Sequence, residues 1–133
     1  MQSLIKKNLK MTEVKCVNLG FIVPESKVRE VQYVFEKHAK WMREFYSEAN
    51  SGDNYLINAF ITKATEFIDP TNPNKGLTGN ILFTLNEKFT SKDSIKRHNE
   101  HASKNEYFQK FIEIKNNYAV FRSAGGEIYL SIK

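Results

Sequence analysis

A histidine and a tryptophan, His38 and Trp41, are the residues of this 133-residue chain best suited to chemistry. Apolar residues recur around them at three- and four-residue spacing, which predicts an amphipathic helix from residue 27 to about residue 49. We expect His38 on its core-facing stripe and Trp41 beside it. Such a histidine can move a proton near neutral pH, and a tryptophan can stack on an aromatic substrate. The alternative is a structural role, with His38 hydrogen-bonded to backbone and Trp41 as packing.

Two asparagines interrupt apolar runs that predict strands. Asn18 lies in the run 14–23, and Asn58 lies in the run 55–67. A buried amide needs hydrogen-bond partners, and in a pocket it could hold a substrate oxygen or stabilise a developing oxyanion. We therefore predict a catalytic role for Asn58 and a substrate-binding role for Asn18. The alternative places both side chains at a sheet edge or in solvent.

Two further histidines, His98 and His101, stand one turn apart in a second predicted helical region. We predict a catalytic role for His98 and substrate binding for His101, with a surface position as the alternative. The pair could chelate a metal, but a metal site needs a third and a fourth ligand. Glu100 lies between them and points elsewhere on a helix. We therefore expect no metal, and the absence of P-loop, GxGxxG, GxSxG, CxxC and HExxH patterns disfavours other cofactors and serine-hydrolase chemistry.

The elements that must position these residues follow from the apolar patterning. Strands are predicted at 14–23, 55–67, 78–89 and 119–132, and helices at 27–49 and 91–117. Lys104–Asn105 could kink the second helix, and Gly125–Gly126 suggest a bulge or tight turn in the last strand. With right-handed crossovers, the order βαββαβ gives a ferredoxin-like α+β fold, a four-stranded antiparallel sheet with both helices on one face.

The predicted strands carry apolar residues on both faces, although helices can cover only one. A chain of this size should not leave a large apolar face in water. We therefore expect a homodimer in which a second copy covers the open sheet face.

Charge and composition exclude several other classes. The net charge is +5, and the first twelve residues contain three lysines and no acid. The remaining charges alternate in sign, so we expect no nucleic-acid partner. The longest apolar stretch is far too short for a membrane span, and the single cysteine, Cys16, has no partner for a disulfide. We expect a cytoplasmic protein with a flexible tail at residues 1–12 and one domain at 13–133.

The third strand and second helix resemble the antibiotic-biosynthesis-monooxygenase-like family of the dimeric α+β barrel superfamily. The resemblance covers about residues 14–124. It is carried by a strand with Leu82, Phe83, Leu85, Glu87 and Phe89, a cap with Ser91 and Asp93, a histidine at His98 or His101, and a final Phe108 and Phe111. The family usually has tryptophan where this chain has Phe89, and its histidine is closer to the final pair.

This resemblance implies a homodimer with a pocket between helices and sheet in each subunit. Members include cofactor-free oxygenases of quinol-like aromatics and lactone isomerases. We therefore expect a cofactor-independent monooxygenase or isomerase of a small hydrophobic or aromatic substrate, in which His38 or a second-helix histidine removes a proton and the asparagines hold the oxyanion. The alternatives are a non-catalytic dimer that binds an apolar metabolite such as a fatty acid, and a structural or regulatory domain without a cavity.

Overall fold

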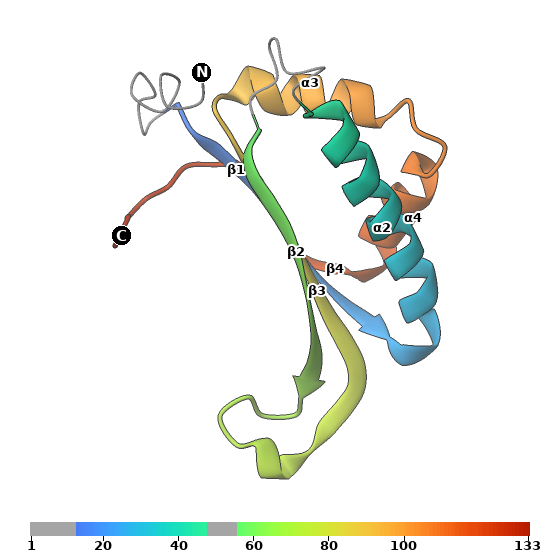
Figure 1. Cartoon of the computed structure of the whole chain (residues 1–133). Coiled ribbons are helices and arrows are strands. Elements are labelled where there is room, and N and C mark those ends of the chain that lie inside the picture. The colour runs from blue at the N-terminus through green and yellow to red at the C-terminus, as the bar shows by residue number, and fades with distance from the viewer. Residues whose placement is uncertain (1–12, 48–55) are drawn as a thin grey trace.

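The computed structural model describes residues 13–47 and 56–133. Its elements are β1 (Lys15–Pro24), the 3-10 helix η1 (Glu25–Lys27), α2 (Val28–Phe45), β2 (Leu56–Phe67), the 3-10 helix η3 (Pro73–Lys75), β3 (Leu77–Phe89), α3 (Lys92–Ala102), α4 (Phe108–Tyr118) and β4 (Ala119–Gly126). The strands form an antiparallel sheet in the order β2-β3-β1-β4. The α-helices of the described residues lie on one face of this sheet (Figure 1). The predicted α+β class and four-stranded antiparallel sheet are therefore confirmed.

The core lies between the sheet and α2, and strand alternation explains it. Successive side chains of a strand point to opposite faces, so every second residue of β1 and β3 meets the helices. On β1 these buried residues are Val17, Leu19, Phe21 and Val23. On β3 they are Phe83, Leu85, Glu87 and Phe89. Glu87 is thus an acid at a core position, between two apolar neighbours on the same face.

The second helical region is two helices, where the sequence predicts one. α3 ends at Ala102, a turn occupies residues 103–107, and α4 begins at Phe108. The turn is closed by short-range backbone hydrogen bonds, including Asn105 N–H to the Ala102 carbonyl at 3.1 Å and Phe108 N–H to the Asn105 carbonyl at 3.1 Å. The Asn105 side chain donates to the same Ala102 carbonyl at 3.0 Å. The expected kink at Lys104–Asn105 is thus a complete break.

The open face of the sheet is less apolar than the sequence pattern suggests. Its central rows carry Asn18, Thr62, Thr84 and Asn86. The Asn18 side-chain amide donates to Asn86 Oδ1 at 3.0 Å, and the Asn86 amide donates to Thr84 Oγ1 at 2.9 Å. Apolar side chains flank this polar centre at the two edges of the sheet, with Phe60 57% and Phe121 58% exposed. The open face is therefore mixed, with a hydrogen-bonded centre.

The last strand ends earlier than predicted. β4 stops at Gly126 instead of Ile132. Gly125 has a φ of 83° beside a shift in the register between β1 and β4, which fits the bulge expected there. The segment 127–133 leaves the sheet on the side away from the helices (Figure 1). Its apolar side chains Tyr129, Leu130 and Ile132 are exposed.

Some predictions fall on residues that the structure does not describe. The predicted tail at 1–12 and the helix stop signal at 50–54 lie outside the described residues. Within them, α2 ends at Phe45 rather than near residue 49. None of the described helices is both long and apolar enough to cross a membrane.

Candidate functional site

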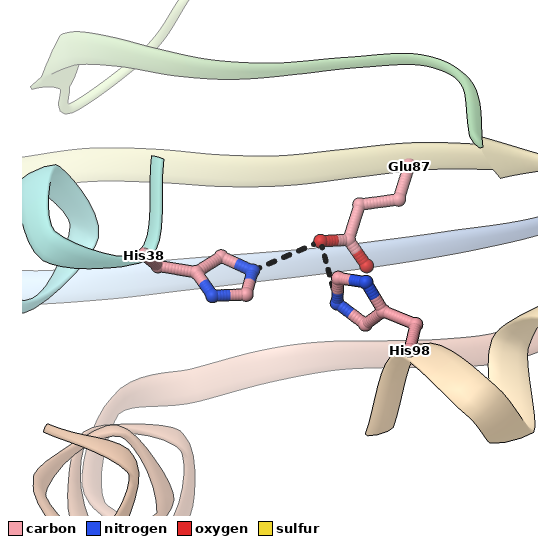
Figure 2. A group of neighbouring side chains, drawn as sticks. All are labelled: His38, Glu87 and His98. Atoms are coloured by element: carbon pink, nitrogen blue, oxygen red, sulfur yellow. Dashed lines mark hydrogen bonds and ion pairs between the residues drawn. The ribbon is translucent and has the colours of Figure 1, made fainter. Parts of the chain in front are cut away.

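Three ionisable side chains meet on the helix-covered face of the sheet. His38 comes from α2, Glu87 from β3 and His98 from α3, and Figure 2 shows both imidazoles directed at one carboxylate oxygen. His38 Nε2 lies 3.1 Å from Glu87 Oε2, and His98 Nε2 lies 3.5 Å from the same oxygen. The exposed fractions are 4%, 4% and 3%, so water is nearly excluded from this His38–Glu87–His98 cluster.

Two tyrosines hold the far side of the imidazoles. The Tyr107 hydroxyl lies 2.7 Å from His38 Nδ1, and the Tyr46 hydroxyl lies 2.7 Å from His98 Nδ1. The Nε2–H of His38 donates to an ionised Glu87 carboxylate, which can only accept, while Nδ1 faces the Tyr107 hydroxyl, which can donate or accept. Both histidines therefore have a fixed orientation, with Nε2 toward the carboxylate and Nδ1 toward a tyrosine.

The break between α3 and α4 makes this arrangement possible. His98 and Tyr107 are nine positions apart, which is about two and a half turns of a continuous helix at 3.6 residues per turn. In one straight helix they would point in opposite directions. Because the turn at 103–107 redirects the chain, His98 contacts Glu87 while Tyr107 contacts His38.

Burial sets the protonation of the groups around Glu87. It lowers the pKa of His98 to about 4, although the charge of Glu87 opposes this and that of His38 adds to it. Burial, with Glu87 second, also raises the pKa of Tyr107 well above its usual value. Burial and the charge of Glu87 also raise the pKa of Tyr46, and the positive charge of Arg97 lowers it by a smaller amount. At neutral pH, His98 is therefore a neutral imidazole and both tyrosines keep their protons.

A cavity of about 290 Å³ opens beside the cluster. His38, Glu87 and His98 form part of its wall, and Asn99 and Lys115 supply further polar groups. The rest of the wall is apolar, formed by Val17, Leu19, Leu85, Ala102, Phe108, Phe111, Ile112 and Ala124. Its size is at the lower end for small-molecule sites, about 300–1,000 Å³. The cavity therefore suits a small, largely apolar molecule with one polar group at the cluster.

The structure brings together only some of the residues singled out in the sequence. His38 and His98 are in the cluster. Trp41 stacks on the His38 ring at 5.7 Å between centroids and meets the His98 ring at 5.2 Å, so it covers the cluster without lining the cavity. His101 lies apart from the cluster, with its ring 4.8 Å from that of Phe45.

The asparagines lie on the opposite face of the sheet. Asn18 pairs in register with Asn86, while its neighbours Val17 and Leu19 line the cavity. Asn58 pairs in register with Lys88, the neighbour of Glu87, and is exposed. Because strand neighbours point to opposite faces, the cluster and these two amides are separated by the sheet. They do not join His38 in one site.

Glu87 is the functional candidate that the sequence predictions leave out. It enters them only as part of the family resemblance. The available signal is its position, because it alternates with Leu85 and Phe89 on the buried face of an apolar strand. A carboxylate at such a position needs buried partners, and His38 and His98 supply them.

The cluster can do two kinds of chemistry. It can accept and pass on a proton, and its three ligand atoms lie within 4.8 Å of one another, as in a metal site.

Comparisons with protein-family models, curated proteins and solved structures find no match. The sheet does not by itself identify a superfamily, so the monooxygenase-like resemblance stays a prediction.

Proposed function

We propose that this protein is an enzyme, a monooxygenase or an isomerase, that acts on a small hydrophobic substrate in the cavity beside the His38–Glu87–His98 cluster. One observation carries this proposal, namely a buried ionisable cluster in the wall of an otherwise apolar cavity. Ionisable groups are rarely buried without a reason, and clefts that contain them are frequent reaction sites.

The cluster supports removal of a proton from the substrate as the first step. Each imidazole has one nitrogen on Glu87 and the other on a tyrosine, so Glu87 is the best-placed acceptor. The His38 hydrogen bond and the His98 contact both fall on its Oε2, and Glu87 lines the cavity. The negative charge left on the substrate would face Lys115, which lines the same cavity. In this proposal Glu87 removes the proton and His38 positions its carboxylate, in place of removal by His38 itself.

The test replaces the acceptor without changing its shape. Glu87→Gln keeps the side-chain volume and removes the base, so turnover should fall by about 10²–10⁴-fold. Native protein and variant would be incubated in air with aromatic quinols and small lactones, following oxygen consumption and isomer formation. Glu100→Gln is the matched control, since Glu100 is exposed on α3. Full turnover in Glu87→Gln, or no turnover of the panel by native protein, would contradict the proposal.

A second candidate function is storage or transport of an apolar metabolite such as a fatty acid, with no reaction. The largely apolar wall of the cavity favours it. The two functions differ in what Glu87→Gln does. A binding protein would turn over no compound of the panel, and the variant would keep the native affinity for a fluorescent fatty acid.

We propose in addition that two copies pair through the open sheet faces, as in a ferredoxin-like dimeric barrel. The exposed Phe60 and Phe121 on that face support this, as do Tyr129, Leu130 and Ile132 of the segment that leaves the sheet on the same side. Native mass spectrometry at micromolar concentration should give a dimer, and Phe121→Lys should shift it toward monomer. A monomeric native protein would contradict the barrel.

A further inference from the structure

We propose that His38, Glu87 and His98 form a binding site for one divalent transition-metal ion, with His38 Nε2, His98 Nε2 and a Glu87 oxygen as its protein ligands. Metal binding itself is independent of the proposed function, and only its catalytic use rests on that function. This proposal replaces the prediction of no metal, which was made from the sequence by weighing only His98 and His101 as ligands. The structure places His101 outside the cluster and brings His38 and Glu87 to His98 instead.

The spacing of the ligand atoms already fits a metal. Ligand nitrogens and oxygens lie about 2.0–2.2 Å from a bound zinc ion, so two ligands are about 3 Å apart at right angles and about 3.4 Å apart in a tetrahedron. The two imidazole nitrogens lie 3.1 Å and 3.5 Å from Glu87 Oε2. All three ligand atoms lie within 4.8 Å of one another. An ion could therefore enter with small side-chain movements.

The tyrosines supply the outer partners that metal-bound histidines need. A histidine that binds a metal through Nε2 usually donates its Nδ1–H to a neighbouring acceptor, which fixes the ring. The hydroxyls of Tyr107 and Tyr46 stand at 2.7 Å from the two Nδ1 atoms. A hydroxyl can donate or accept. With a metal on Nε2, the imidazole proton would sit on Nδ1 and the tyrosine hydroxyl would accept it, so each ring keeps its tyrosine partner.

Charge also favours a cation here. The buried ion pairs that the structure gives Glu87 are with His38 and His98. Because His98 is a neutral imidazole at neutral pH, it does not compensate the negative charge of this buried carboxylate. A divalent ion would compensate it.

The ligand set points to a reactive metal rather than a structural one. Structural zinc sites are closed by four protein ligands, whereas reactive sites keep a position open. Two histidines and one carboxylate are the set used by non-haem iron(II) oxygenases. The adjoining cavity gives a water, dioxygen or substrate oxygen access to the remaining positions. With nitrogen and oxygen donors and no thiolate, the site suits iron(II), cobalt(II) or zinc.

The test is direct metal binding by the full chain. Protein stripped with EDTA and dialysed would be titrated with Zn²⁺ by calorimetry and with Co²⁺ by visible absorption. We expect one ion per chain, with a Co²⁺ spectrum typical of nitrogen and oxygen ligands. His98→Gln should weaken binding by more than about 100-fold, beyond the range of an outer-partner change. Tyr107→Phe, which keeps all three ligands, should weaken binding by about 10–100-fold.

His101→Gln is the matched control, because it changes the same residue type on α3 outside the cluster. Its affinity should equal that of native protein. Absence of binding to native protein, or equal losses in His101→Gln and His98→Gln, would overturn the metal site. If circular dichroism shows that the His98→Gln variant does not fold, the Tyr107→Phe variant provides the test. A metal affinity of Tyr107→Phe equal to that of native protein would then overturn the metal site.

Failure of the metal site can be told apart from failure of the proposed function. Turnover that persists in EDTA, with no binding of either ion, would support the proposed enzymatic function and contradict the metal site. Binding of one ion with no turnover of any substrate would support the metal site and contradict the enzymatic function.

Discussion

Between pH 7 and pH 4 the metal-free protein is expected to lose about 3 kcal/mol of its free energy of unfolding through His98. Burial lowers the pKa of His98 to about 4 in the folded protein, against an ordinary value of 6.5. On acidification the unfolded chain takes up this proton first, which favours unfolding. The contribution is therefore fully present above about pH 6.5 and is lost as the pH falls toward 4. A difference of this size corresponds to about 3 kcal/mol, at 1.36 kcal/mol per pH unit.

Urea unfolding in EDTA at pH 7, 6, 5 and 4 measures this loss. Other groups also titrate in this range, so the comparison with His98→Gln is decisive. That variant has no imidazole to take up the proton, so its free energy of unfolding should fall by about 2–3 kcal/mol less than that of native protein over the range. His101→Gln should follow the native curve. Equal slopes in native protein and His98→Gln would mean that His98 is not held neutral by burial.

Much of the sheet could be predicted from local pattern. Four strands were expected near their observed positions because each carries a run of apolar residues ended by turn-forming residues. The alternation of Val17, Leu19, Phe21 and Val23 is local, so it is visible without knowledge of the fold. The same row shows why Asn18 lies on the other face. The odd-numbered positions are uninterrupted and apolar, whereas Asn18 and Gly20 interrupt the even ones.

The His38–Glu87–His98 cluster could not be predicted in the same way. His38, Glu87 and His98 come from three elements, and their contact depends on how α2 and α3 pack on β3. No spacing rule connects residues 49 positions apart, as His38 and Glu87 are. The helix break adds to this, because a continuous helix would point Tyr107 away from the cluster. Sequence could mark Glu87 as an acid on a buried strand face, but only packing shows its partners.

Glu87→Leu is expected to lower the free energy of unfolding by about 1–3 kcal/mol, the usual penalty for leaving a buried hydrogen-bond donor without a partner. The substitution fits the space, since neighbouring inward positions of β3 hold Leu85 and Phe89. It leaves the His38 Nε2–H buried without its acceptor and removes the contact between His98 Nε2 and the carboxylate. Urea unfolding in EDTA at pH 7 measures the loss. Glu100→Leu, an exposed control on α3, should stay within about 0.5 kcal/mol of native.

Replacing the whole cluster should have a different result from breaking it. In a variant that combines His38→Phe, Glu87→Leu, His98→Phe, Tyr46→Phe and Tyr107→Phe, no side chain of the cluster keeps a polar group without a partner. Buried polar sets replaced by apolar residues often equal or exceed native stability. We expect this variant to regain most of what Glu87→Leu loses, while binding no metal and turning over no substrate. If Glu87→Leu alone were as stable as native protein, the hydrogen bonds of the cluster would carry no weight. Regained stability with lost chemistry would mean that the fold does not need this cluster, and that its reactions account for its place in the core.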